Sequence, residues 1–159
     1  MQKGMFQEIN HLLVEIFRNI LTVEEQTLRT TQLDLSIGEL HILETIGQHC
    51  RKEEVGCSIS QIAQDQEITL PSVTVAVKKL EKKGFVQKVR SAEDARVVRV
   101  TLTRTGRRAD AAHRYFHEQM VRSLLREVSE EQAPMLRDAL RNLNQFVHMQ
   151  AAEAALLNE

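Results

Sequence analysis

The sequence predicts a mainly α-helical protein with a small β-hairpin wing, in which a winged helix-turn-helix core is flanked by N- and C-terminal dimerisation helices. Apolar residues recur at helical spacing through most of the 159 residues, and only two prolines and six glycines interrupt them. Two β-rich runs follow a basic helix near the middle of the chain. A helix followed by a basic hairpin is the layout of a winged helix.

Two helices with a short linker are expected in the first third of the chain. The first covers 8–30, and residues 31–35 form the linker. A second helix starts at Ser36, because Ser36 and Glu39 form a capping box, and it continues to about residue 48. The apolar stripe of the first helix is made by Ile9, Leu12, Leu13, Ile16, Ile20 and Val23.

The next segment has the pattern of a helix-turn-helix. The polar residues 49–57 predict a loop, and a short helix starts at Ser58. A turn at 65–68 leads into a basic helix that Thr69 can cap and Gly84 ends. In a helix-turn-helix the second helix enters the major groove of DNA. Its buried face is expected to carry Val73, Val77 and Leu80.

A hairpin and two further helices complete the chain. The β-rich runs Phe85–Val89 and Val97–Leu102 are joined by the polar turn 91–95. A long helix is expected over about 107–127, and a last helix begins near Ala133, just after a second capping-box signal. The hairpin therefore forms the wing, and the long helices lie outside the core.

The length of the chain favours one domain, 1–159. Residues 36–106 are expected to form the winged helix-turn-helix core, 8–30 and 107–150 a helical dimerisation region, and 151–159 a fraying tail. Long apolar helices at both ends most simply bury their stripes against a second copy. A twofold-symmetric homodimer is therefore expected.

The composition indicates where in the cell the protein is expected to be located. The chain has no apolar run of membrane-spanning length, and its N-terminus lacks the apolar segment of a signal peptide. A cytoplasmic protein is expected. Cys50 and Cys57 match no CxxC pattern and are expected to be small apolar residues, with a redox-active pair as the alternative.

Basic residues concentrate between Ser72 and Arg108. That window holds eleven lysines and arginines against three acidic residues, a net charge of +8 in a chain whose net charge is −1. A basic patch on an otherwise acidic protein is typical of polyanion binding. The alternative is a solvated, lysine-rich helix face.

The helix-turn-helix pattern assigns roles within this basic window. Ser72 and Thr74 lie at the exposed start of the second helix, where base edges are within reach. Arg96 follows the wing turn and is expected in the minor groove, while Asp94 orients Arg90 or Arg96 or is a plain turn residue. Lys78 and Lys79 are expected to contact DNA phosphates. The full set of candidate DNA-contacting residues is Ser60, Gln61, Ser72, Thr74, Lys78, Lys79, Arg90, Asp94 and Arg96.

These motifs resemble the MarR family, the multiple-antibiotic-resistance-type transcriptional regulators. The pattern Asp94-x-Arg96, followed by Val100-x-Leu102-Thr103 and Gly106, is similar to the wing signature of that family. Ser72-Val-Thr74 followed by Leu80-Glu-Lys-Lys-Gly84 is similar to its recognition helix. The resemblance implies a homodimeric, sequence-specific DNA-binding regulator, most simply a repressor, that binds a pseudo-palindromic double-stranded operator.

Within the family, the chain most resembles the fatty-acid-biosynthesis repressors. The resembling pieces include Ile16-Phe17-x-Asn19, Glu39-x-His41 and Arg114-x-Phe116-His117. This resemblance implies acyl carrier protein with a long acyl chain as corepressor. The acyl chain is expected to bind against apolar surface from Phe17, Leu21, Leu40 and Leu43. A basic face is expected to steer the acidic carrier protein, and it comprises Arg104, Arg107 and Arg108.

This sequence is also similar to a second branch, the zinc-responsive MarR repressors, at four positions. The resemblance to the metal site of that branch implies four ligands: Glu25, His41, His113 and His117. The last two are at i, i+4 on one helical face. Zinc is thus the candidate cofactor, although none is required. The alternative is that these histidines are hydrogen-bonded interface residues.

An enzyme is the third alternative. The same histidines with Glu25 are a donor set for a hydrolytic metal with an open position. The sequence contains no HExxH motif, no nucleophile elbow and no glycine-rich phosphate loop. A regulator that is not an enzyme is therefore the preferred interpretation.

Overall fold

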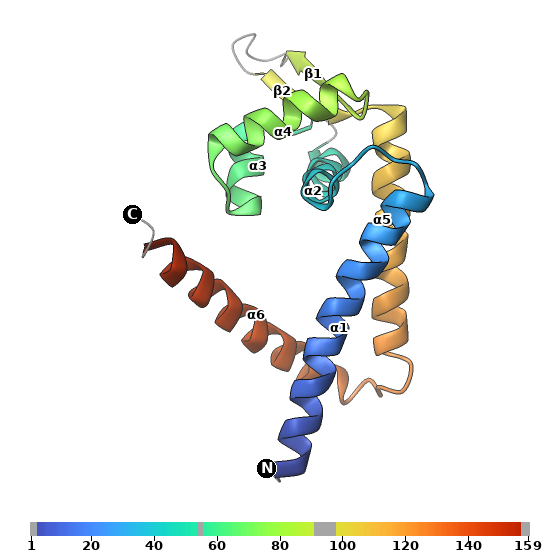
Figure 1. The fold of residues 1–159 in the computed structure, drawn as a ribbon, viewed down its shortest axis with the longest axis vertical. Coiled ribbons are helices and arrows are strands. Elements are labelled where there is room, and N and C mark those ends of the chain that lie inside the picture. The colour runs from blue at the N-terminus through green and yellow to red at the C-terminus, as the bar shows by residue number, and fades with distance from the viewer. Residues whose placement is uncertain (1–2, 54–55, 91–97, 157–159) are drawn as a thin grey trace. The chain divides into compact units, whose positions relative to one another are not determined.

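The computed structural model describes residues 3–53, 56–90 and 98–156 (Figure 1). Within them the chain is helical apart from one antiparallel hairpin, which confirms the predicted fold class. None of the described helices is both long and apolar enough to cross a membrane. In chain order the elements are α1 (Lys3–Thr30), α2 (Ile37–Glu53), α3 (Ile59–Gln66), α4 (Leu70–Lys82), β1 (Val86–Arg90), β2 (Val98–Leu102), α5 (Arg104–Leu124) and α6 (Ala133–Leu156).

The chain divides into two compact units. The first covers 1–114 and contains α1, the helix-turn-helix, the hairpin and the start of α5. The second covers 115–159 and contains the rest of α5 and α6. The single domain expected from chain length stays a prediction.

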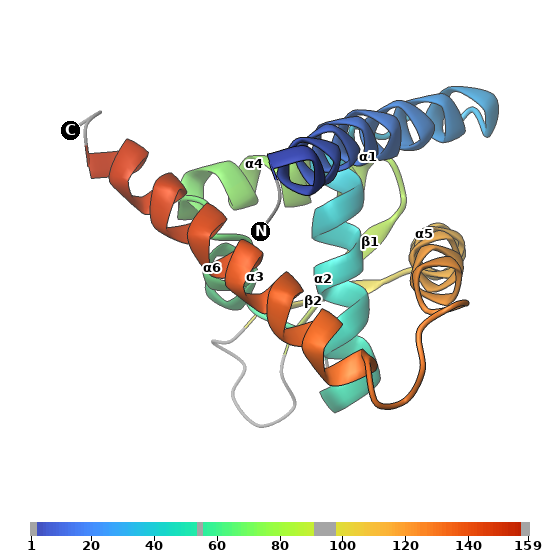
Figure 2. The same cartoon turned by 90° about the horizontal axis from the view of Figure 1, so that it is seen from below.

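Helices α2, α3 and α4 contact one another and form the helix-turn-helix, as Figures 1 and 2 both show. Ser58 caps α3 with a reciprocal capping box, and Thr69 caps α4 by accepting from the Ser72 N–H. Between the two helices, Glu67 takes a left-handed conformation with φ of 52° that ends α3. Local signals in the sequence therefore set both ends of the turn.

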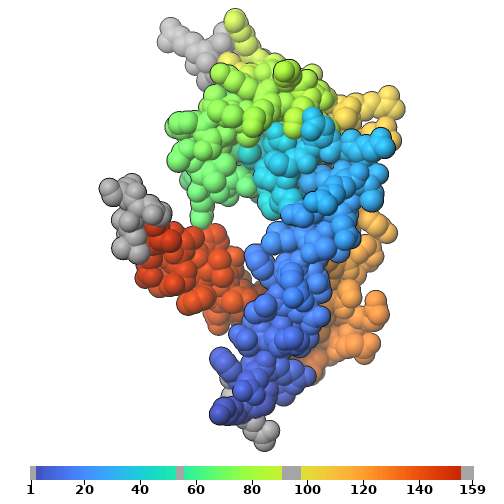
Figure 3. All heavy atoms as spheres, viewed as in Figure 1, coloured from blue at the N-terminus to red at the C-terminus, as the bar shows by residue number. Residues whose placement is uncertain are grey.

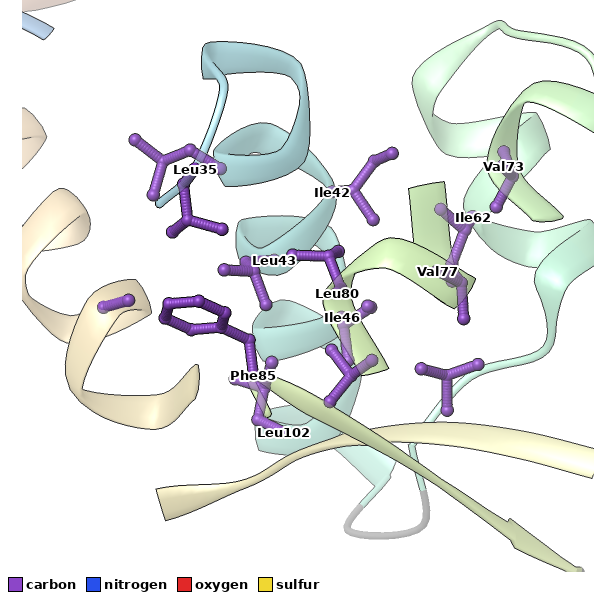
Figure 4. Close-up of a cluster of buried hydrophobic side chains, with 14 of the residues drawn as sticks. Leu35, Ile42, Leu43, Ile46, Ile62, Val73, Val77, Leu80, Phe85 and Leu102 are labelled. Atoms are coloured by element: carbon purple, nitrogen blue, oxygen red, sulfur yellow. The ribbon is translucent and has the colours of Figure 1, made fainter. Parts of the chain in front are cut away.

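The hydrophobic core lies between α2, α4 and the hairpin (Figure 4). Side chains of α2 such as Leu43 and Ile46 point toward Leu80 of α4 and toward Phe85 and Leu102 beside them. Burial of each such side chain contributes roughly 1.5–3 kcal/mol. The fully buried members are Leu43, Ile46, Cys57, Ile62, Val73, Val77, Leu80 and Val100.

The hairpin is tied to the helix-turn-helix at its base. Its register pairs Val86 with Leu102 and Arg90 with Val98. In addition, Cys57 and Val100 form an antiparallel bridge, with N···O distances of 3.1 and 2.7 Å. The segment that precedes α3 therefore continues the sheet beside β2. Backbone hydrogen bonds thus join the hairpin to the helix-turn-helix.

Thr103 joins the start of α5 to the end of α4. Its hydroxyl donates to the Gly84 carbonyl at 2.7 Å and accepts from the Gly106 N–H at 3.1 Å. Its own N–H donates to the Phe85 carbonyl at 3.0 Å. Gly106 lies so close to that carbonyl that a Cβ built on it would be 2.0 Å from the oxygen. A glycine is therefore required where α5 begins.

Several predicted boundaries were wrong. Helix α1 begins at Lys3, not at residue 8, and α2 continues to Glu53, so the expected loop starts later. The last turn of α2 is stabilised because Arg51 pairs with the buried Asp110 of α5, a contact that local sequence does not reveal. Helix α6 extends through part of the tail that was expected to fray and ends at Leu156.

Helix α1 has little cover in the single chain. Only Glu24 and Leu28 are buried among its residues. Figure 3 shows its side chains, in blue, uncovered along the viewed face. The exposed apolar residues of this helix are Met5, Phe6, Ile9, Leu12, Leu13, Val14, Ile16, Phe17, Leu21 and Val23.

Candidate nucleic-acid interface

Helix α4 buries one face in the core and presents lysines on the other. Lys78, Lys79 and Lys82 are exposed, and no hydrogen bond or ion pair engages their side chains within the described part of the chain. In contrast, Lys88 pairs with Glu81 at 2.7 Å. The outer face of α4 therefore carries unneutralised positive charge, as polyanion binding requires.

Lys83 has a structural role instead. Its Nζ lies 2.9 and 3.2 Å from the two carboxylate oxygens of Glu39, which is 7% exposed, at the start of α2. Burial acts to raise the pKa of Glu39, but hydrogen bonding from the Ser36 N–H and the ion pair with Lys83 outweigh it and lower that pKa below its ordinary value. This pair fixes the C-terminal end of α4 against α2.

The hydroxyl groups predicted to read bases are both engaged within the helix. The Thr74 hydroxyl donates to the Leu70 carbonyl at 2.8 Å, and the Ser72 hydroxyl lies 2.9 Å from that of Thr69. Each hydroxyl oxygen keeps a lone pair for a further donor. The roles of Ser72 and Thr74 in base recognition stay predictions.

The remaining predicted DNA contacts differ in environment. Ser60 and Arg90 are exposed, whereas the Gln61 side chain accepts from the Ser58 N–H and so belongs to the α3 cap. Asp94 and Arg96 lie outside the described residues. The predicted DNA-contacting residues that the structure describes lie in α3, α4 and β1, all in the first unit.

The metal-site prediction needs one correction. Glu25 is exposed and pairs with Arg29 at 3.9 Å. Glu24 is the buried neighbour, 5% exposed, and its Oε2 lies 3.9 Å from Nε2 of His41. Glu24, and not the predicted Glu25, therefore lies beside His41. The sequence alone does not separate the two glutamates, because the burial of Leu28, one helical turn after Glu24, is seen only in the structure.

Three side chains of the first unit gather as a potential metal-binding set. The ligand atoms of Glu24, His41 and His113 all lie within 4.8 Å of one another. The imidazole rings of His41 and His113 are 5.7 Å apart, and His113 Nε2 is also 3.3 Å from Oε2 of Glu44, which sequence reasoning missed. His117 belongs to the second unit, where its ring contacts Phe116.

The four residues predicted for an effector pocket do not share one environment. Leu40 and Leu43 are buried members of the core. Phe17 is 68% exposed, and Leu21 is also exposed, on α1. An acyl-chain pocket lined by all four stays a prediction.

Comparison with known proteins agrees with this geometry. Residues 27–111 match the family described as transcriptional regulator SarA/Rot. Among solved structures, FabT from Streptococcus pneumoniae in complex with DNA is 37% identical; the match covers 90% of this chain and 97% of that chain, with a TM-score of 0.75.

Two more distant structures share the fold. MepR from S. aureus, in complex with DNA, is 22% identical over 87% of this chain and 95% of its own, with a TM-score of 0.67. A MarR family protein from Bacillus stearothermophilus is 21% identical over 93% and 99%, with a TM-score of 0.62. A search of curated protein sequences returned no significant match.

Proposed function

Since this chain belongs to the MarR family of DNA-binding transcriptional regulators, we propose that it is a homodimeric repressor of fatty-acid biosynthesis genes with long-chain acyl carrier protein as corepressor. The observation that carries the DNA-binding part is the outer face of α4, where Lys78, Lys79 and Lys82 are exposed and unpaired among the described residues. DNA phosphates are the partners that such a face fits.

Exposed apolar side chains support the homodimer. In the first unit they line α1, and in the second unit Met135, Phe146 and Met149 of α6 are each more than half exposed. Exposed apolar side chains in this number are typical of an interface. A twofold dimer binds half-sites about one helical turn, roughly 34–36 Å, apart. Light scattering tests this, and a monomer at micromolar concentration with and without operator would contradict it.

Two features support the acyl carrier protein as corepressor. Phe17 and Leu21 offer exposed apolar surface on α1, and Arg104 and Arg108 are exposed one turn apart at the start of α5. Carrier proteins are acidic, so these arginines provide a complementary surface. The sequence resemblance to the fatty-acid-biosynthesis branch points the same way.

Titration of operator DNA with protein tests the corepressor. Long-chain acyl carrier protein is expected to tighten binding at least fivefold, a coupling of about 1–3 kcal/mol, whereas unacylated carrier has no effect. Arg104→Glu should reduce this ratio, and Arg137→Glu on α6 is the charge-matched control. Equal operator affinity with acylated and unacylated carrier would reject the corepressor but leave the regulator class intact.

A second candidate signal is zinc, which the grouping of Glu24, His41 and His113 favours. Two imidazoles and a buried carboxylate fit Zn²⁺ by donor chemistry. When bound, zinc would be held by these three residues and would tie α1 to α2 and α5. We expect Glu24→Gln, but not the neighbouring Glu25→Gln, to abolish zinc binding measured by calorimetry. Release of operator by chelator, without any response to acylated carrier, would favour this candidate over the first.

A further inference from the structure

An apolar side chain occupies the outermost position of the recognition helix. Val75 is 53% exposed and lies two residues from Val73 and from Val77, both of which are fully buried. Two residues correspond to about 200° around an α-helix, so Val75 lies on the face opposite the core. Ser72 and Thr74, whose hydroxyls are engaged within the helix, lie to its sides.

Val75 belongs to an exposed apolar patch, which we define as Ile68, Leu70 and Val75. Single exposed apolar residues are ordinary, but these three lie within eight residues at the start of α4. Ile68 and Val75, together with Pro71 and Ala76, also line a groove of about 600 Å³ whose other side is formed by the start of α2. Two residues of the patch therefore line a shaped surface, whereas Leu70 lies outside this groove.

Two exposed lysines lie beside this patch and indicate what occupies it. Lys79 lines the same groove, and Lys78 is exposed on the same outer face as Val75. Apolar surface next to unpaired lysines fits a partner that is anionic at its edges and has apolar groups between them. The major groove of DNA has this character, because phosphates flank it and the C5-methyl of thymine is the apolar group on its base edges.

We propose that Val75 packs against a thymine C5-methyl group in the major groove and selects thymine at one position of each operator half-site. The inference rests on the proposed DNA-binding function and deepens it by naming a base and a readout. Burying one methyl is worth about as much as burying a methylene, which corresponds to roughly a fourfold change in affinity.

The test replaces thymines by deoxyuridine one at a time in an operator selected by the protein from random duplexes. Deoxyuridine lacks the methyl but keeps the hydrogen-bonding edge, so the substitution isolates the apolar contact. Fluorescence anisotropy at fixed salt measures the affinity of the protein for each operator. At one thymine per half-site, loss of the methyl should lower the affinity of the parent protein about fourfold. Val75→Ala should bind thymine and deoxyuridine operators equally.

Lys78→Ala is the matched control, since it alters a neighbouring exposed residue expected on a phosphate. This variant should bind both operators more weakly but keep the fourfold ratio. Alanine is a strong helix former, and circular dichroism checks that both variants stay folded. The inference is overturned if no thymine methyl matters, or if Val75→Ala keeps the discrimination while operator binding persists. Failure to select any duplex would instead overturn the proposed function.

Discussion

Replacing Gly106 with alanine adds a methyl group where the start of α5 meets the Phe85 backbone. The new Cβ would lie 2.0 Å from the Phe85 carbonyl oxygen and 3.0 Å from its carbonyl carbon. Because the obstacle is backbone, no side-chain rotation relieves the clash. Phe85 is itself fixed by the Thr103 N–H, so the helix start and the hairpin must separate.

The expected magnitude combines opposing terms. Overpacking against a fixed neighbour costs about 1–3 kcal/mol, and weakening the Thr103 hydrogen bonds adds roughly 0.5–1.5 kcal/mol each. The higher helix propensity of alanine returns up to about 1 kcal/mol. We expect Gly106→Ala to lower the free energy of unfolding by about 2–3 kcal/mol.

Urea unfolding followed by circular dichroism, at one protein concentration, measures this difference. Gly38→Ala is the control, because a Cβ there would meet nothing within 4 Å and α2 should gain up to about 1 kcal/mol from alanine. The two substitutions are thus expected to change stability in opposite directions. A Gly106→Ala variant as stable as the parent would refute the reasoning from this close approach.

Three further outcomes are expected. Lys79→Ala should lower the slope of log affinity against log salt by about 0.9 for each phosphate that the variant no longer neutralises; weaker binding with an unchanged slope would argue against a phosphate role. Hydrogen bonding from the Ser36 N–H and the ion pair with Lys83 lower the pKa of Glu39 in the folded state, so these interactions stabilise the protein above the ordinary glutamate pKa, and this stabilisation disappears as pH falls through the folded value. Unfolding curves of the parent and Glu39→Gln should therefore differ at neutral pH and converge in acid; a constant difference would contradict this. Asp110→Ala removes the buried partner of the half-exposed Arg51 and should cost roughly 1–3 kcal/mol in urea unfolding, whereas an unchanged midpoint would show the ion pair to be dispensable.

The sequence predicted the features that local chemistry controls. The caps at Ser36 and Thr69 form as expected, because each depends on residues three positions apart. Gly84 ends its helix with φ of 79°, a conformation that glycine adopts without strain. The hairpin strands followed from β-rich runs of the right length.

Features that depend on distant parts of the chain were missed. Nothing near Arg51 predicts that it pairs with Asp110, since the two residues are 59 positions apart. Glu24 and Glu25 are identical in type, and only packing decides which one faces His41. Similarly, Lys79 and Lys83 look alike in sequence, but Lys83 is held by Glu39. Site residues on helix surfaces are sorted by tertiary contacts, so composition alone cannot assign them.

The backbone bridge between Cys57 and Val100 has a consequence for local opening. Its two hydrogen bonds join the wing to the residue just before the α3 cap, so the hairpin base cannot detach without also freeing the start of the helix-turn-helix. The wing base and the turn should therefore open as one cooperative unit. Amide hydrogens of Cys57 and Val100 are expected to exchange at the same rate as those of the buried turns of α4. A substitution that loosens the wing base would then also loosen the start of the helix-turn-helix.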